Sequence, residues 1–517
     1  MTTLPKTSFY ITTPIYYVND RPHIGHAYTS LACDVLARFK RLDGYRVHFL
    51  TGTDEHGQKI AQSAAAKGLD PQVFTDEVSQ SFRHLATVMG YSYDDFIRTT
   101  EARHKAVCQQ LWQVLEARGY IYLDTYEGWY CVSDEAYYDE KELFRQPDGS
   151  LRTSLGKTVE WLREENYFFR LSAFGDKLLA LYAAQPDFVL PASRLNEVRS
   201  FVASGLKDIA VSRTTFDWGV PVPGNDKHVM YVWLDALTNY ISALGAPATA
   251  AELYETFWPA TLHVVGKDIL RFHAVYWPAF LMAADWPLPG RVFAHGWWTN
   301  EGQKISKSLG NVIDPLELVA TYGLDPTRYF LLREVPFGND GDFSRAAMET
   351  RLNADLANAY GNLAQRVLSM IFKNCAGQLP AMNSLSAADT ALLGQVDGLL
   401  AVVRAHMDRQ AFHKALEETW RVIAAANAYV DAQAPWVLKK TDPERMAVVL
   451  AVLHEAIRKL TLLLQPFMPE STSTLLAALS VKETARDFSA WSVPLPAGTA
   501  IAKPSAVFPR YEATTPQ

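Results

Sequence analysis

Cysteine is scarce in this sequence. Only four cysteines occur in 517 residues, and no two of them form a CxxC pair. Thiols so widely scattered do not make the disulfide framework of a secreted scaffold, and a structural zinc site takes four ligands. We therefore expect a reducing compartment and no structural zinc.

Long apolar runs and targeting segments are absent too. No stretch reaches the roughly 20 apolar residues that a transmembrane helix needs, and residues 1–7 resemble neither a signal peptide nor an Arg-rich presequence. We expect a cytoplasmic protein without a membrane partner. A net charge of −7 also disfavours non-specific binding of polyanions by the whole surface, so a nucleic acid would have to be bound by local basic and aromatic patches.

The first hundred residues alternate strand-like and helix-like segments. A β-rich run at 9–13, an amphipathic helix at 25–42 and an apolar strand at 47–50 predict a parallel sheet. From about 117 to 225 the sequence becomes irregular and rich in aromatic residues and acids, which indicates an inserted domain. The alternation then resumes with a helix at 232–244, a strand at 262–265, a helix at 268–283 and a strand at 292–294.

The last third of the chain is helical almost throughout. Apolar residues recur there every three or four positions, which is typical of an antiparallel helical bundle, in the stretches 345–373, 386–408, 411–431 and 442–465. We predict an α/β domain in two halves, 1–116 and 226–342, interrupted by the inserted domain at 117–225. The bundle follows at 343–480, and a tail rich in Pro, Ala and Ser at 481–517.

A compact motif, His23-Ile-Gly-His26, stands between the first strand and the first helix. A helix N-terminus presents free N–H groups and a partial positive charge that favour phosphate, and Gly25 lets a nucleotide approach the backbone closely. His23 and His26 can donate hydrogen bonds to a phosphate whose charge rises in a transition state. Two polar residues that merely cap the helix give the same pattern, and cytidylyltransferases carry a similar signature.

A second motif, Lys304-Ile-Ser-Lys307-Ser, lies about 280 residues later between Gly302 and Gly310. Small, polar and basic residues between glycines predict a mobile loop that closes over a polyphosphate, where a lysine supplies a point charge for departing pyrophosphate. A solvated basic turn has the same composition. The two motifs together, with the sheet resuming between them, form a much more specific pattern than either alone.

These motifs resemble the HIGH and KMSKS motifs of the class I aminoacyl-tRNA synthetases, with Ile305 in place of the usual methionine. From about residue 8 to 470 further segments are similar, in the same order, to the methionyl-tRNA synthetases within that class, among them TGTDEHG at 51–57, YVWLDAL at 231–237 and GKDILRFH at 266–273. The resemblance implies an α/β fold: a Rossmann-type parallel-sheet catalytic domain with an inserted connective domain, followed by an all-α helical-bundle anticodon-binding domain.

The resemblance also implies a reaction. The carboxylate of L-methionine attacks the α-phosphorus of ATP, which Mg²⁺ accompanies, and the methionyl group then passes to tRNA(Met), including the initiator. By this resemblance the catalytic residues are His23, His26, Lys304 and Lys307, and ATP is bound by His23, Gly25, His26 and Lys307. Because the carboxylate is already a nucleophile, positioning and charge stabilisation carry the catalysis.

A methionine pocket is implied by the same resemblance. Its walls are Ile15, Tyr17, Asp54, Trp233, Leu237, Tyr240 and His273. An aromatic cavity suits a thioether, and a carboxylate beyond the carboxyl end of a strand can pair with the α-ammonium group. Judged by spacing alone, Trp233 and Tyr240 are as readily part of a core stripe, and Asp54 is as readily a cap or turn residue.

Asn362, Arg366 and Trp436 match the residues that read the CAU anticodon in the family. Asn and Arg supply donors and acceptors for base edges, and an indole stacks on an unpaired base. Without the resemblance, Trp436 would be taken for a core residue.

The sequence departs from many relatives at two places. They carry paired CxxC zinc knuckles in the inserted domain, where this chain has only Cys131, so we expect a zinc-free insertion. Because the sequence ends soon after the bundle, we expect no further C-terminal domain of the kind that some relatives have, and we expect a monomer.

Two alternative functions stay open. One is a sister class I synthetase, although the leucine, isoleucine and valine enzymes need a large editing insertion and the cysteine enzymes a zinc thiolate site. The other is a catalytically inactive tRNA-binding paralogue, which would be expected to break the two motifs.

Overall fold

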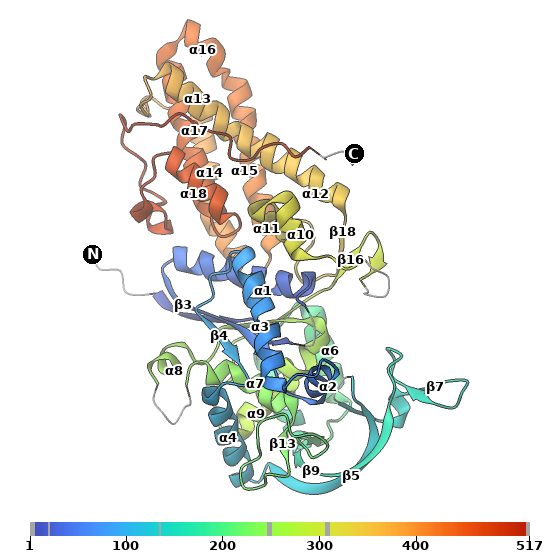
Figure 1. Cartoon of the computed structure of the whole chain (residues 1–517). Helices are drawn as coiled ribbons and strands as arrows, with labels where there is room; N and C mark the ends of the chain where they lie inside the picture. The colour runs from blue at the N-terminus through green and yellow to red at the C-terminus, as the bar shows by residue number, and fades with distance from the viewer. Residues whose placement is uncertain (1–5, 19–20, 134–135, 246–250, 306–310, 513–517) are drawn as a thin grey trace.

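The computed structural model describes residues 6–18, 21–133, 136–245, 251–305 and 311–512 of the chain. Figure 1 shows an elongated molecule with helices at one end, a parallel sheet in the middle and an antiparallel arm near the other end. Among the described residues we find no helix with the length and apolarity needed to cross a bilayer. All four cysteines are free thiols.

The central sheet is parallel, with strand order β10-β15-β14-β1-β3-β2 and β4 alongside β3. Its strands are β1 (Lys6–Thr12), β2 (Tyr16–Tyr17), β3 (Tyr45–Asp54), β4 (Asp95–Arg98), β10 (Val189–Leu190), β14 (Leu262–Gly266) and β15 (Val292–His295). Successive residues of a strand point to opposite faces. Phe9 and Ile11 therefore enter the core on one face, while Tyr10 enters the core on the other.

Helices cover both faces of this sheet, as parallel sheets require. α1 and α11 pack on one face, and α4, α7 and α9 on the other. The helices of the α/β part are α1 (Ile24–Leu42), α2 (Gln58–Ala66), α3 (Pro71–Val88), α4 (Ala102–Ala117), α7 (Val232–Ser242), α8 (Glu252–Phe257), η4 (Lys267–Ile269), η5 (Phe272–Tyr276), α9 (Trp277–Ala284), α10 (Pro315–Tyr322) and α11 (Leu324–Arg333).

The strand order reverses at β1. From β1 the chain passes through α1 to β3 on one side, whereas on the other side β1 pairs with β14, which leads to β15. Open α/β sheets bind ligands in the crevice beyond the carboxyl ends of the strands at such a reversal. The fold therefore predicts a ligand site among the residues at the carboxyl ends of β1, β3, β14 and β15.

One predicted helix of the α/β part is divided. The pattern at 268–283 predicts a single helix, but the structure has η4, a π-helix at η5 and then α9. Pro278 has no N–H to donate to Ala274 four residues earlier. The Tyr182 hydroxyl donates to the Ala274 carbonyl oxygen instead, at 2.6 Å. Pro278 does not disturb the apolar period, yet the helix changes to a π-helix just before it, in the segment that carries His273.

The segment between the two halves forms an antiparallel arm. Its four-stranded sheet has the order β11-β9-β5-β6, with β5 and β9 forming the long curved ribbon in Figure 1. The elements are β5 (Ile121–Cys131), β6 (Ala136–Tyr138), η1 (Glu140–Glu142), β7 (Phe144–Arg145), β8 (Leu151–Arg152), β9 (Glu160–Phe169), η2 (Leu171–Phe174), α5 (Gly175–Ala184), α6 (Ala192–Ala203), β11 (Ile209–Ala210), β12 (Ser212–Arg213) and β13 (Val229–Met230). Strand β10 lies between α5 and α6 in the chain, yet it pairs with β15 of the central sheet.

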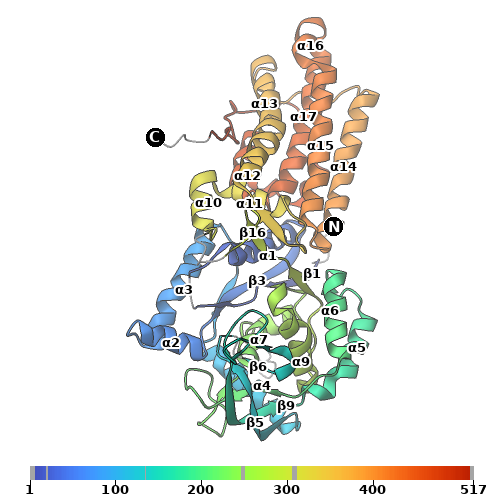
Figure 2. The same ribbon diagram turned by 90° about the vertical axis from the view of Figure 1, so that its right-hand side faces the viewer.

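A three-stranded sheet connects the α/β part to the helices. It has the order β17-β16-β18, from β16 (Trp298–Asn300), β17 (Gln303–Lys304) and β18 (Gly341–Phe343). The helices that follow run along the long axis of the molecule, with α16 at the tip (Figure 2). They are α12 (Arg345–Arg351), the π-helix η7 (Leu352–Gly361), α13 (Asn362–Asn374), α14 (Ala387–Asp408), α15 (Phe412–Gln433), α16 (Pro435–Thr441), α17 (Pro443–Leu464) and α18 (Pro469–Ala478), with η8 (Glu483–Ala485) and η9 (Phe488–Ala490) in the tail.

A buried arginine links the bundle to the α/β part. Arg328 of α11 donates to Asp34 Oδ2 of α1 at 2.6 Å and to the carbonyl oxygen of Met89 at 2.9 Å. It also donates to the carbonyls of Pro466 and Phe467, just after α17, at 2.8 and 3.1 Å. Burial alone would raise the pKa of Asp34, but Arg328 and Arg38 hold it below its ordinary value. One guanidinium thus joins three parts of the chain through hydrogen bonds to a charged carboxylate and to carbonyls.

The predicted fold class is confirmed: a Rossmann-like parallel-sheet domain followed by a helical domain. Individual bounds differ by a few residues. The strand predicted at 47–50 extends over β3, so Asp54 is its last residue rather than the residue beyond it. The helix predicted at 345–373 includes η7, whose wider turn changes which residues share a face.

Candidate active site

A cavity of about 360 Å³ opens where the strand order reverses, a volume within the range of small-molecule sites. Segments that follow β1 and β14 line it, together with residues at the ends of β3 and β15 and the faces of α1 and α7. The structure brings every residue predicted to bind ATP or methionine, apart from the second motif, to this one cavity: Ile15, Tyr17, His23, Gly25, His26, Asp54, Trp233, Leu237, Tyr240 and His273.

The two histidines of the first motif cap the helix that follows them. His23 Nδ1 accepts from the Gly25 N–H at 3.1 Å, and His26 Nδ1 accepts from the His23 N–H at 3.1 Å. A neutral imidazole whose Nδ1 accepts carries its hydrogen on Nε2. Capping the helix and binding a ligand are therefore compatible roles. The hydrogen bonds of the cap fix the tautomer, and in that tautomer Nε2–H can donate to a ligand.

The electrostatics of the pair favour the neutral form. Burial lowers the pKa of His26 well below its ordinary value, and the nearby His23 lowers it further. Desolvation lowers the pKa of His23 as well, and Asp268 opposes that change. The rings stack with centroids 3.8 Å apart. At neutral pH they are uncharged donors held next to each other at the N-terminus of α1.

Aromatic rings form the opposite wall. Trp233 of α7 stacks on Phe272 with centroids 3.7 Å apart. His273 Nδ1 donates to the Ile269 carbonyl oxygen at 2.9 Å, which leaves Nε2 to accept from the Tyr240 hydroxyl at 2.6 Å. Burial lowers the pKa of His273 to about 4, so this imidazole is neutral near pH 7 and the hydrogen bond keeps its direction.

Asp54 is followed by two anchored residues. Glu55 is fully buried and accepts from Arg98 Nε and from the Thr53 hydroxyl at 2.7 Å each. The next residue is His56, whose Nδ1 lies 2.6 Å from Asp235 Oδ2. Asp54 itself is 8% exposed and lines the cavity. The neighbours fix the backbone, so the carboxylate that faces the cavity has a defined place.

The second motif begins near the cavity. Lys304 is the last residue of β17, which pairs with β16, and β16 follows directly on Trp297 of the cavity wall. Asn300 Nδ2 donates to the Asn311 carbonyl oxygen at 2.8 Å, which brings the two ends of the intervening loop together. Lys307 lies outside the described residues.

Several cavity residues were not predicted from the sequence. They are Asp268, His295, Trp297 and Lys59 among others. The first three lie within segments that carry the family resemblance, at the end of β15 or shortly after β14 and β15. The rule that ligands bind at the carboxyl ends of strands would have found them. Lys59 gives no such signal, because it lies in the first turn of α2 among ordinary helix residues.

The predicted anticodon residues lie in the helical part. Asn362 is exposed at the start of α13, and Arg366 lies one turn further along it. Arg366 Nη1 is 3.8 Å from Asp431 Oδ1, on the α15 segment that leads into Trp436. The Trp436 side chain is 47% exposed at the start of α16 and is not part of the core.

Potential metal ligands gather at one place in the part of the chain that the structure describes. His104, Cys108 and Asp235 have ligand atoms within 4.8 Å of one another, outside the range 117–225. Cys131 is buried in β5. The expected absence of structural zinc stays a prediction.

Comparison with known proteins identifies the family. A family model described as tRNA synthetases class I (M) matches residues 9–368, and one described as the anticodon binding domain of methionyl tRNA ligase matches residues 379–515. The chain belongs to the methionyl-tRNA synthetases of class I. It is therefore an aminoacyl-tRNA synthetase of the methionine type, and the two alternative functions are not favoured.

Individual methionyl-tRNA synthetases match over nearly their whole length. The methionine–tRNA ligase of Mesorhizobium japonicum is 56% identical over 98% of both chains, and that of Brucella suis biovar 1 is 55% identical over 98% of this chain and 99% of its own. A solved structure of the Mycobacterium tuberculosis methionyl-tRNA synthetase in complex with methionyl-adenylate is 52% identical, with a TM-score of 0.95 over 98% of this chain and 100% of that chain.

Proposed function

We propose that this enzyme uses ATP to convert L-methionine into methionyl-adenylate in the cavity, and then transfers the methionyl group to tRNA(Met), including the initiator. One observation carries the proposal: ten residues assigned from the sequence to ATP or methionine line a single cavity of about 360 Å³. The similarity to a solved structure that holds methionyl-adenylate supports the same ligand here.

Methionine binds at the aromatic end of the cavity. Asp54 pairs with the α-ammonium group, and the thioether lies against Trp233, Leu237 and Tyr240, where sulfur–ring contacts are favourable. Ile15, Tyr17 and His273 complete the wall. The substrate carboxylate then points toward the N-terminus of α1, where the nucleotide phosphates are bound.

The activation step is a displacement at phosphorus. A methionine carboxylate oxygen forms a bond to the α-phosphorus, the bond to the bridging oxygen breaks, and pyrophosphate leaves. His23 and His26 donate Nε2–H to phosphate oxygens, and Gly25 allows the nucleotide to approach the backbone. Lys307 neutralises the triphosphate and Lys304 makes a secondary contact. Mg²⁺ enters with ATP, bound through phosphate oxygens. Fixed donors aimed at developing charge are the main source of acceleration in such a reaction.

In the second step a hydroxyl of the terminal adenosine of the tRNA attacks the acyl carbon, and AMP leaves. Asn362 and Arg366 contact the edges of anticodon bases, and Trp436 stacks on one base, which accounts for an indole that is half exposed in a helical domain.

The organisation proposed with this function has five parts. These are the two catalytic halves 1–116 and 226–342, a zinc-free connective domain at 117–225, an anticodon-binding domain at 343–480 and a tail at 481–517. We propose a cytoplasmic monomer.

The exchange of labelled pyrophosphate into ATP tests the proposal when each of the twenty amino acids is supplied in turn. Methionine alone should support rapid exchange. Exchange with leucine, isoleucine, valine or cysteine instead would refute the substrate, and no exchange with any amino acid would indicate an inactive paralogue.

The role of the second motif is tested by Lys307→Ala. We expect at least a hundredfold loss of exchange rate, about the size of losing one preorganised donor. Lys304→Ala is the matched control and should cost less. A near-normal rate for Lys307→Ala would refute the assignment.

A further inference from the structure

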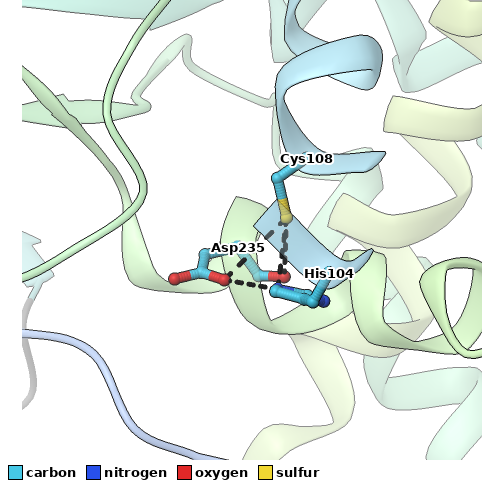
Figure 3. Close-up of side chains that lie close together, drawn as sticks. All are labelled: His104, Cys108 and Asp235. Atoms are coloured by element: carbon cyan, nitrogen blue, oxygen red, sulfur yellow. Dashed lines mark hydrogen bonds and ion pairs between the residues drawn. The ribbon is translucent and has the colours of Figure 1, made fainter. Parts of the chain in front are cut away.

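A buried carboxylate lies behind the cavity wall. Asp235 is in the first turn of α7 and is 0% exposed. Its Oδ1 lies 2.6 Å from His104 Nε2, and its Oδ2 lies 2.6 Å from His56 Nδ1. Figure 3 shows Asp235 with His104 and Cys108 of α4. An ionised carboxylate only accepts hydrogen bonds, so each imidazole carries a hydrogen on the nitrogen that faces it.

Asp235 and its partner His56 lie on two different segments, and each segment carries residues that line the cavity. His56 follows Asp54 by two residues in the chain, so one hydrogen bond links Asp235 to the segment that carries the ammonium-binding carboxylate. Asp235 itself stands on α7 between Trp233 and Leu237, which line the aromatic end. Asp235 is absent from the residues that line the cavity.

The third element, α4, holds α7 at both ends. His104 Nδ1 lies 2.7 Å from Ser242 Oγ at the last residue of α7, and His104 Nε2 contacts Asp235 in the first turn. The loop after β3 is supported from outside as well, because the Trp218 indole donates to the Glu55 carbonyl oxygen at 2.6 Å. These contacts leave little freedom for either wall to shift alone.

Charge strengthens the connection. Burial would raise the pKa of Asp235, but His56 and His104 hold it well below its ordinary value. The carboxylate also lies in the first turn of an eleven-residue helix, where the helix dipole favours an anion. Hydrogen bonds to an ionised acceptor are roughly twice as strong as neutral ones. Burial raises the pKa of the Cys108 thiol well above its ordinary value, and the nearby Asp235 carboxylate raises it further. The thiol therefore stays protonated.

The spacing of these groups favours hydrogen bonding over metal binding. Two ligands at about 2.0–2.1 Å from a tetrahedral zinc ion lie roughly 3.3 Å apart. His104 Nε2 and Asp235 Oδ1 are 2.6 Å apart, a hydrogen-bond length. Zinc would also require the thiolate of Cys108.

We propose that Asp235 is a positioning residue that fixes the segment carrying Asp54 relative to the helix carrying Trp233 and Leu237, and so sets the affinity for methionine without touching it. The inference rests on the proposed methionine pocket. It implies that a change in this network alters the KM for methionine much more than the KM for ATP, because the ATP end of the cavity is built on α1 and not on this network.

The decisive variant is Asp235→Asn, which keeps the volume and removes the charge. In pyrophosphate exchange by the full chain, we expect the KM for methionine to rise by about tenfold or more, with the KM for ATP changed less than about twofold. Cys108→Ala is the matched control beside it and should leave both KM values within about twofold of the parent.

A second pair of variants keeps the proposal testable if Asp235→Asn does not fold. The amide nitrogen of Asn reaches the position of a histidine Nδ1, so His56→Asn retains a donor to Asp235, whereas His56→Ala does not. His56→Asn should stay near the parent in its KM for methionine, and His56→Ala should show the increase expected of Asp235→Asn.

Three results would overturn the inference: an unchanged KM for methionine in Asp235→Asn or His56→Ala, an equal rise of both KM values, or a stoichiometric metal in the parent enzyme that Cys108→Ala loses. Elemental analysis of the purified chain checks the last. If the parent enzyme shows no methionine-dependent exchange, the proposed function fails first and this inference fails with it.

Discussion

The α/β part and the helical part of the molecule present their proposed binding residues in opposite ways. In the α/β part, Asp54, Tyr240 and His273 are 8%, 1% and 1% exposed, and each is held by neighbours from other segments. In the helical part, Trp436 is 47% exposed and its neighbour Val437 is 50% exposed. The first site is built inside a core, and the second is displayed on a surface.

This difference predicts how each of the two parts responds to substitution of its binding residues. A site of buried polar groups depends on tautomers, charges and distances that the surrounding fold imposes. Substitutions that break these buried hydrogen bonds should alter catalysis and folding together, and only a side chain that keeps them should separate the two. A half-exposed aromatic residue contributes little to the core. Its loss should therefore weaken binding and leave folding intact.

The junction between the ends should give the largest effect. Arg328→Met leaves the buried Asp34 with only one arginine and breaks the bonds to the carbonyls after α17, so we expect a loss of about 3–5 kcal/mol in the free energy of unfolding. Urea unfolding followed by circular dichroism measures it. Arg38→Met, whose side chain is 29% exposed, is the control and should lose less. Equal losses would mean that Arg328 does not hold the two ends together.

Inside the cavity, two substitutions of His26 separate its two roles. His26→Asn places an acceptor near Nδ1 and keeps the helix cap, but it has no donor at the Nε2 position. We expect near-normal stability and a loss of exchange rate of about 10²–10³-fold. His26→Gln keeps a donor and loses the cap, which costs about 1 kcal/mol of stability. If His26→Asn is the more active of the two, the tautomer argument is wrong.

At the exposed end, Trp436→Ala should affect one step only. Loss of a stacked base costs about 1–3 kcal/mol, so kcat/KM for charging tRNA should fall by roughly 5- to 150-fold. Pyrophosphate exchange without tRNA and the midpoint of thermal unfolding should not change. Val437→Ala is the neighbouring control. A loss of exchange activity in Trp436→Ala would contradict the separation of the two ends.

Buried histidines in both parts predict a pH dependence of stability. Burial lowers the pKa of His263, His273 and His295 in the α/β part, and that of His454 in the bundle, to about 4 for His273 and His454. The unfolded chain therefore binds more protons than the folded one between pH 6.5 and about 4, and the free energy of unfolding falls as pH is lowered through that window. Each such histidine contributes up to about 1.4 kcal/mol per pH unit.

Urea unfolding at pH 7.5 and 5.0 measures this loss. His454→Gln in the bundle should reduce the change in the free energy of unfolding with pH by the contribution of one histidine. His263→Gln should do the same in the α/β part. A stability that does not change between these pH values would show that the buried imidazoles do not titrate on unfolding.

Local sequence determined the elements and the two motifs. The apolar periods at 386–408 and 442–465 predict helices whose ends lie within one residue of those of α14 and α17, because the apolar face of a helix follows from the spacing of residues close together in the chain. The first motif could be placed at a helix start because Gly25 and its flanking histidines are adjacent in the chain. The assignment of ten residues to one cavity came from resemblance to a family and not from any period.

Only the tertiary structure decided which distant side chains meet. Asp268 and His295 reach the cavity because β14 lies beside β1 and β15 lies beside β14, and Asp235 meets His56 across 179 positions of the chain. Sequence reasoning left Trp436 open between a core position and an exposed one, and the structure exposes 47% of it. Periodicity also did not predict that the Tyr182 hydroxyl would donate to the Ala274 carbonyl oxygen, to which Pro278 has no N–H to donate. Periodicity reports the face on which a side chain lies. Contacts between elements depend on how the elements pack, and that packing is a property of the whole chain.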